Sequence, residues 1–145
     1  MPLPEPRSGL VIGYAYLWHE EYLDGMEEGR KDRPCAVVLA VRQEDGDIVT
    51  TVAPITHSAP GDPHDAIELP ASIKGTLGLD GARSWLVCTE LNRFVWPGPD
   101  LRPIRRDAPG QFVYGMLPPG FIRQVFARIQ ALRESRRPVV VARTP

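Results

Sequence analysis

Apolar residues in this chain fall into short runs, separated by polar segments that are rich in proline and glycine. The first run, Leu10–Trp18, is aromatic and β-branched, which predicts a strand. The second run, Cys35–Arg42, is apolar at almost every position, as expected of a central strand. The turn residues Glu44–Asp47 separate it from Ile48–Ile55, so these two runs are expected to pair as a hairpin.

Shorter segments follow this hairpin. Ala66–Leu69 and Ser84–Thr89 have the composition of strands, and Pro70–Leu79 can hold one or two helical turns because proline is tolerated in the first turn. Phe94–Ile104 is expected to be extended and broken by prolines, and Pro138–Thr144 to be either a strand or a frayed tail. Loops are expected at His19–Asp32 and Thr56–Asp65.

One long helix is predicted near the C-terminus, over Gly120–Ser135. Phe121, Val125, Ile129 and Leu132 recur at helical spacing there, which gives the segment one apolar face. Prolines lie before and after the segment, at the positions where helices commonly begin and end.

The length of 145 residues fits a single domain. Sixteen prolines and thirteen glycines divide the chain into short elements, which is typical of a small β-rich domain. We therefore expect a mainly β fold of the α+β class. Its single domain would span residues 9–137, with a disordered arm at 1–8 and a tail or short strand at 138–145.

The expected location is cytoplasmic. No apolar run approaches the roughly 20 residues that a membrane span needs, and Met1–Ser8 lacks the apolar core of a signal peptide. No membrane partner is therefore expected. Cys35 and Cys88 lie within apolar runs, so we expect both to be buried free thiols.

Charge is divided unevenly along the chain. Residues 1–72 hold 5 basic and 13 acidic residues, a net charge of −8, whereas residues 73–145 hold 12 basic and 5 acidic residues, a net charge of +7. All basic residues other than Lys31 and Lys74 are arginines. Arginine binds phosphate through a planar fork, so the second half suits a nucleic-acid ligand. The preference for arginine can equally follow from genome composition.

The common sequence motifs for phosphate-binding loops, dinucleotide binding, zinc proteases and serine hydrolases do not occur. His57, Asp62, His64 and Asp65 fall within one loop, but no further ligand residue joins them. We therefore expect them to be solvated loop residues, and no metal or cofactor is expected.

Several short motifs occur in a specific order. A glycine precedes the first strand, an Arg-Pro pair leads into the second, the third ends in Pro-Ile-Thr, and a short strand precedes a buried one. These elements are Gly9–Ile12, Arg33–Leu39, Val52–Thr56, Ala66–Leu69 and Ser84–Glu90. Together with the amphipathic helix, this order resembles the MazF/PemK family of bacterial toxins over about residues 9–135.

The resemblance implies a small SH3-like barrel of the MazF/PemK/CcdB type that acts as a homodimer and cleaves single-stranded RNA without a metal. The usual partner in the family is an antitoxin whose tail occupies the RNA groove. The chain would then be a toxin that inhibits growth by cutting mRNA. Arg33 and Thr56 match active-site residues of the family, and Glu28 matches an acidic residue that shapes the site in some members.

The residue types agree with that chemistry. RNA carries its own nucleophile, the 2′-OH, next to the phosphate that is cleaved. Arg33 would stabilise the charge that develops on this phosphate, and Thr56 would exchange a hydrogen bond with the phosphate or the 2′-OH. The general base would be Glu28, His57 or solvent. The residues expected to bind substrate are His57, Ser58, Trp96 and Arg102.

Simpler interpretations exist for the same residues. Arg33 can be a solvated residue at the start of a strand, Thr56 an ordinary strand end, and His57 an exposed loop histidine. Trp96 is a candidate for stacking on an unpaired base, whereas Trp85 is expected in the core. The alternative function is a non-catalytic binding module of the same fold, either a gyrase-directed toxin or an RNA-binding protein. In each case we expect a homodimer to which the helix over Phe121–Leu132 contributes.

Overall fold

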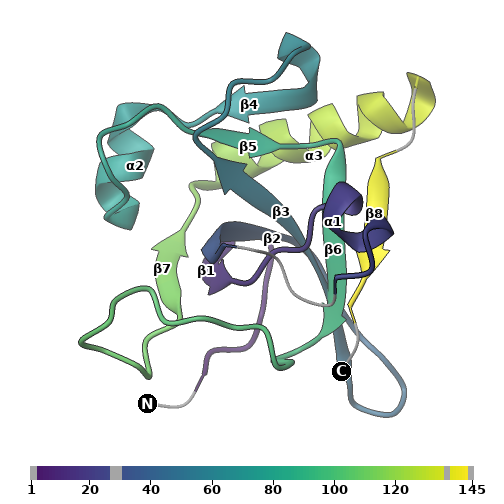
Figure 1. The fold of residues 1–145 in the computed structure, drawn as a ribbon, viewed down its shortest axis with the longest axis vertical. Coiled ribbons are helices and arrows are strands. Elements are labelled where there is room, and N and C mark those ends of the chain that lie inside the picture. The colour runs from purple at the N-terminus through teal and green to yellow at the C-terminus, as the bar shows by residue number, and fades with distance from the viewer. Residues whose placement is uncertain (1–2, 27–30, 136–137, 144–145) are drawn as a thin grey trace.

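The computed structural model describes residues 3–26, 31–135 and 138–143. Within these ranges the fold is mainly β, with an eight-stranded, mostly antiparallel sheet and a long helix near the C-terminus (Figure 1). The strands are β1 (Leu10–Tyr14), β2 (Arg33–Arg42), β3 (Ile48–Thr56), β4 (Ala66–Glu68), β5 (Trp85–Val87), β6 (Glu90–Val95), β7 (Val113–Met116) and β8 (Val139–Ala142). The helices are α1 (His19–Leu23), α2 (Ala71–Leu77) and α3 (Pro119–Ser135), with a short 3-10 turn at Pro63–Asp65.

Strand β3 is the centre of the sheet. One edge of β3 pairs with β2, and the other edge pairs with β6 along Val49–Val52 and with β5 at Ile55 and Thr56. The strand order runs β4-β5-β3-β2-β1-β7, and β8 extends the β6 side as a parallel neighbour. The expected hairpin of β2 and β3 is confirmed, and it carries the longest strands of the sheet.

The central strands bury both faces, which explains why their sequences are apolar at nearly every position. Along β1, Val11 belongs to a cluster on one face of the sheet, whereas Leu10 and Ile12 belong to a cluster on the other. Cys35 and Cys88 are free and fully buried, as expected, one in each cluster.

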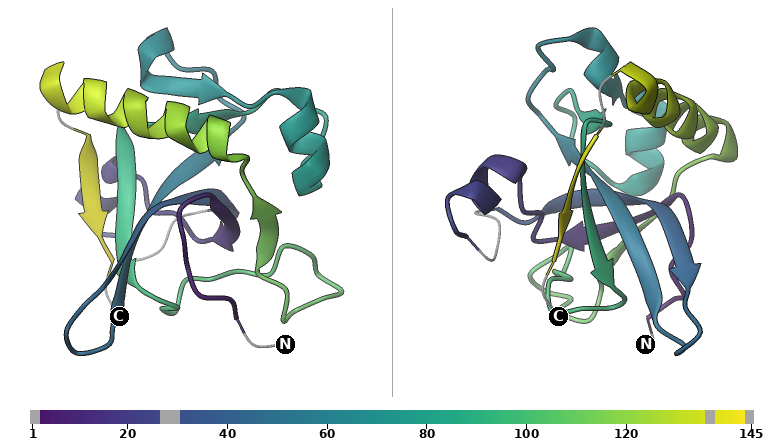
Figure 2. Two further views of the ribbon diagram at one scale, coloured as in Figure 1. Left: turned by 180° about the vertical axis from the view of Figure 1, so that it is seen from behind. Right: turned by 90° about the vertical axis from the view of Figure 1, so that its right-hand side faces the viewer.

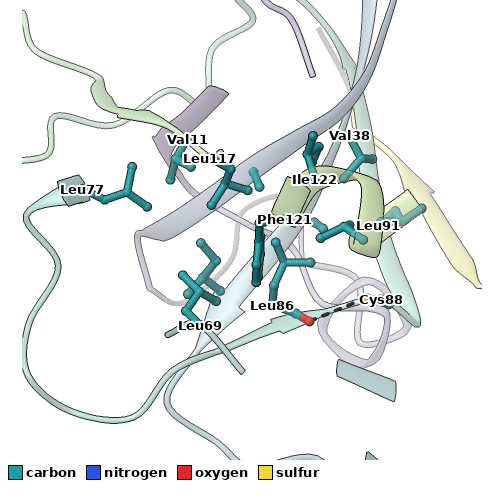
Figure 3. Close-up of a cluster of buried hydrophobic side chains, with 14 of the residues drawn as sticks. Val11, Val38, Leu69, Leu77, Leu86, Cys88, Leu91, Leu117, Phe121 and Ile122 are labelled. Atoms are coloured by element: carbon teal, nitrogen blue, oxygen red, sulfur yellow. Dashed lines mark hydrogen bonds between the residues drawn. The ribbon is translucent and has the colours of Figure 1, made fainter. Parts of the chain in front are cut away.

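Helix α3 covers the first of these faces (Figure 2). Its buried residues Phe121, Ile122, Val125 and Leu132 follow the predicted helical spacing and pack against the sheet. Figure 3 shows Phe121 and Ile122 among side chains of the sheet, with Leu86 and Cys88 beside them. The helix begins at Pro119, where the missing N–H of proline costs no hydrogen bond. The predicted helix is therefore confirmed, and its apolar face packs within the chain itself.

An aromatic cluster fills the second face. Tyr14 stacks on Phe94 with 4.7 Å between ring centroids, and Tyr16 meets Trp18 edge to face at 5.0 Å. The loop from Asp100 to Phe112 crosses β1 at Gly13, whose carbonyl accepts a hydrogen bond from the Arg102 N–H at 2.8 Å. A Cβ atom at Gly13 would lie 2.3 Å from the Arg102 carbonyl oxygen, so only glycine permits this close approach.

A buried polar network fixes the last strand. An Nη atom of Arg143 donates to the Ala15 carbonyl at 2.7 Å and to the Asn92 side chain at 2.9 Å, and the other lies 3.0 Å from an Asp100 carboxylate oxygen. Only 1% of the Arg143 side chain is exposed. Asn92 in turn bonds both backbone polar groups of Leu17. Residues 139–142 therefore form a strand, one of the two expected alternatives for this segment.

The structure differs from the predicted elements at four places. The strand predicted over Leu10–Trp18 ends at Tyr14, because Leu17 turns aside to bond Asn92. The predicted loop His19–Asp32 contains the short helix α1. Strand β6 begins at Glu90, ahead of the predicted extended segment Phe94–Ile104, and β7 was not predicted at all.

The residues expected to form a disordered arm contact β2 at two points. The Ser8 hydroxyl donates to the Val38 carbonyl at 3.1 Å, and Glu5 forms an ion pair with Arg42. None of the helices in the described ranges is long and apolar enough to cross a lipid bilayer.

One part of the sheet lies beyond the cover of α3. Exposed apolar side chains gather there on β2, β6, β8 and the outer side of α3, and we call this set the apolar face: Leu39, Val41, Val95, Phe126 and Val140. Three of these side chains, Leu39, Phe126 and Val140, line a groove of about 980 Å³, together with Arg93 and Arg133.

Candidate functional site

A pocket of about 450 Å³ opens where the start of β2 meets the end of β3. The two strands are antiparallel with Cys35 opposite Pro54, so residues before Cys35 and after Pro54 lie at the same edge of the sheet. The turn after α2, residues near β5 and β7, and the loop before β7 complete the wall. The lining residues are Lys31, Asp32, Arg33, Pro34, Ile55, Thr56, His57, Ser58, Gly78, Leu79, Asp80, Ser84, Ile104 and Tyr114.

Four of the predicted site residues line this pocket together: Arg33, Thr56, His57 and Ser58. Trp96 lies at the opposite end of β3, where its N–H bonds the Ile48 carbonyl and its ring packs near Phe94. Arg102 is not among the residues that line the pocket. Its guanidinium lies 3.6 Å from the carboxylate of Asp32, which does line the pocket. Glu28 falls outside the residues that the structure describes.

Arg33 is held by an aromatic ring. Its guanidinium carbon lies 5.0 Å from the centre of the Trp18 ring, a cation–π contact. The Nε atom is buried and has no hydrogen-bond partner. An unsatisfied buried donor costs about 1–3 kcal/mol, so this atom is unfavourable to the fold, and a ligand in the pocket would meet the other nitrogens of the guanidinium.

Thr56 has its hydroxyl proton available. The Ser58 N–H donates to Thr56 Oγ1 at 3.2 Å, so the oxygen already acts as an acceptor in the turn that follows β3. The hydroxyl proton can still be donated to a ligand in the pocket.

His57 is engaged at both ring nitrogens. Nε2 lies 3.0 Å from an Asp80 carboxylate oxygen, and Nδ1 lies 3.0 Å from the Arg83 carbonyl oxygen and 3.3 Å from Ser84 Oγ. The protonated imidazolium can donate to the carboxylate and the carbonyl at once. His57 thereby ties the loop after β3 to the segment before β5, and it forms one side of the pocket.

Asp80 was not predicted as a site residue. Helix α2 ends at Gly78 in a left-handed conformation, φ 71°, and the turn directs the chain back toward β3. The second Asp80 carboxylate oxygen lies 3.9 Å from the buried Lys74 amine. Gly78 directly after an apolar helix residue was the available signal for this turn, but nothing local indicated that Asp80 would meet His57.

Tyr114 also lines the pocket without having been predicted. It comes from β7 and is half-buried, packing against the core cluster beneath α3. Burial raises the pKa of Tyr114, and the negative groups near it, Asp32 and Asp80 among them, add to this shift. The phenol is therefore protonated at neutral pH.

The charges in the pocket favour an anion. Asp32 lies 3.6 Å from the Arg102 guanidinium, and Asp80 faces His57 and Lys74. Both carboxylates in the pocket wall thus have cationic partners. Arg33 and Lys31 have no ion pair with a carboxylate in the described ranges, so their charges are available to a ligand.

No group of three or more potential metal ligands lies close together within residues 3–26, 31–135 and 138–143. In the loop that follows β3, His57 contacts Asp80, and His64 contacts Asp62 at 3.1 Å. Comparison of the chain with protein-family models, with curated proteins and with solved structures gives no match.

Proposed function

We propose that this protein is the toxin component of a type II toxin–antitoxin pair, an endoribonuclease that cleaves single-stranded RNA without a metal. The observation that carries the proposal is one pocket that joins Arg33, Thr56, His57 and Ser58. Two of these residues, Arg33 and Thr56, are the ones that the family resemblance assigns to catalysis. Arg33 and Lys31, which have no ion pair within the part of the chain that the structure describes, support an anionic substrate such as the RNA backbone.

In the proposed reaction the 2′-OH oxygen attacks the adjacent phosphorus, and the bond from phosphorus to the 5′ oxygen breaks. The leaving 5′ oxygen takes a proton from water, and the products are a 2′,3′-cyclic phosphate and a 5′-OH. Arg33 lines the pocket, and its guanidinium donates to the non-bridging oxygens as negative charge grows on them. Thr56 donates its hydroxyl proton to the same phosphate.

The proton of the 2′-OH needs an acceptor, and we propose the His57–Asp80 pair. Asp80 lies in the pocket wall, and one of its carboxylate oxygens lies 3.0 Å from His57 Nε2. With both of its ring nitrogens in contact with neighbouring groups, His57 holds Asp80 in place. The arrangement supplies an acceptor for the proton without a metal ion.

The proposal includes an SH3-like barrel, a cytoplasmic location, an antitoxin partner and a two-fold dimer. Helix α3 was expected to contribute to the dimer, but its apolar side packs on its own sheet except at Phe126. We therefore place the contact between two copies on the apolar face. A surface of this kind is unfavourable to leave in water and suits a self-complementary interface.

Cleavage of single-stranded RNA in excess EDTA tests the function. We expect cleavage to persist, and to stop when the 2′-OH at the cut position is replaced by hydrogen, because the nucleophile is then missing. Arg33→Ala should lower the rate by about 10²- to 10³-fold, the usual effect of removing one donor to a developing oxyanion. It should also relieve growth arrest in a bacterium that expresses the protein.

Arg42→Ala is the matched control, because Arg42 lies at the other end of β2 on an exposed surface. It should remain as active and as toxic as the wild type. Loss of cleavage in EDTA with recovery in magnesium would contradict the mechanism. RNA binding with no cleavage under any condition would favour the binding-module alternative.

A further inference from the structure

The residues that line the pocket are of two chemical kinds. Arg33, Thr56 and Ser58 supply polar groups, whereas Leu79, Ile104 and the ring of Tyr114 supply apolar surface. A phosphate group alone would use only the polar groups, so the apolar surface calls for a second part of the same ligand.

The side chain of Tyr114 is positioned to stack on a planar ring of a ligand. Its own ring packs against the core cluster beneath α3 and also lines the pocket, so the core fixes it from behind. Leu79, which packs against the same cluster, and the half-buried Ile104 also line the pocket. An aromatic side chain fixed in this way provides a stacking surface with little loss of conformational entropy.

The volume agrees with a ligand larger than phosphate. Sites for small organic molecules span about 300–1,000 Å³, and this pocket holds about 450 Å³. Single-stranded RNA presents unpaired bases, and proteins commonly stack these on aromatic side chains while basic groups follow the phosphates.

We propose that the pocket holds one unpaired nucleotide of the RNA, with its phosphate at Arg33 and its base against the ring of Tyr114. This inference rests on the proposed function, because it takes RNA as the ligand. It adds that Tyr114 is a binding residue. The protein would contact the RNA at one base as well as along the RNA backbone.

The test measures binding rather than cleavage. The probe is a fluorescently labelled single-stranded RNA with 2′-fluoro substituents, which lack the nucleophile. A matched set of oligonucleotides carries one abasic position each. For the wild-type protein, we expect one abasic position to weaken binding by about 5- to 150-fold, the range for loss of one base–aromatic stack.

Tyr114→Leu keeps the apolar packing but removes the aromatic ring, and Tyr114→Phe keeps the ring. Tyr114→Leu should weaken binding of the unmodified probe, and the sensitive abasic position should then cause little further loss. Tyr114→Phe should behave as the wild type. Thermal unfolding of each variant verifies that the fold is retained.

The outcomes separate the inference from the function. If the probe binds and no abasic position distinguishes the wild type from Tyr114→Leu, the nucleotide site is wrong and the proposed function stands. If the probe does not bind the wild-type protein at all, the proposed function fails, and the inference fails with it.

Discussion

The side chains of His57 and Asp80 are both exposed, so the contact between them contributes little to the stability of the fold. We expect His57→Ala and Asp80→Asn each to lower kcat for RNA cleavage by about 10²- to 10⁴-fold, the range for loss of a general acid or base. The double variant should lose little more than either single one, because the two groups act as a unit. Steady-state kinetics of the three variants provides the measurement.

Two results would contradict this role. Multiplicative losses in the double variant would mean that the residues act independently. A change confined to KM would mean that they bind RNA without taking part in proton transfer.

A second prediction at the scale of single residues concerns the two cysteines. Burial raises the pKa of Cys88 to about 12, and burial raises the pKa of Cys35 further still. Because the thiolate is the reactive form, neither residue should react with a thiol reagent at pH 8 in the folded protein. Both should react after denaturation. Fast labelling of the native protein at pH 8 would show that one of the two clusters opens to solvent.

At the scale of elements, β8 depends on one buried ion pair. Arg143→Met removes the nearer of the two arginines beside the buried Asp100 carboxylate, since Arg102 lies 4.0 Å from it, and should lower the free energy of unfolding by about 3–5 kcal/mol. Asp107→Asn removes the partner of Arg105 in an ion pair of the same type that is fully exposed, and should change stability little. Urea denaturation of both variants makes the comparison. Equal losses would mean that β8 is held by its backbone pairing alone.

The sequence predicted the elements whose pattern is local. The hairpin of β2 and β3 followed from two apolar runs around a turn, and α3 followed from apolar residues at helical spacing. Strand β6 begins before its prediction because Asn92 and Arg93 interrupt the apolar pattern. Asn92 is tolerated in the interior only because residues far away in the chain satisfy its amide.

In the candidate site, too, the residues that could be predicted are those that belong to a local sequence pattern. Arg33 and Thr56 were identified through short motifs, and antiparallel pairing of β2 and β3 brings them to one edge. Asp80 comes from the turn after α2, and Tyr114 comes from β7, which was not predicted. Their place in the pocket depends on tertiary packing, which no pattern along the chain records.

For the whole molecule, we expect a dimer formed through the apolar face. Leu39→Asp puts a charge into this surface and should give a monomer at micromolar concentration, because burying an unpaired charge is unfavourable. Leu23→Asp is the matched control, since Leu23 is an exposed leucine on α1 outside the apolar face. Light scattering of both variants and the wild type measures the mass. A wild-type monomer at that concentration would contradict the dimer.

The position of the buried Arg143 in the chain also determines when, during synthesis, its contacts can form. The carbonyl of Ala15, which accepts its hydrogen bond, is made 128 residues earlier. At about 5–20 residues per second, the ribosome needs roughly 6 to 26 s to bridge that interval. During this time the segment after β1, Asn92 and Asp100 lack the cation that joins them in the finished fold. The nascent chain would therefore reach its stable form only after Arg143 has been added, and a partner that binds the incomplete fold would have those seconds in which to do so.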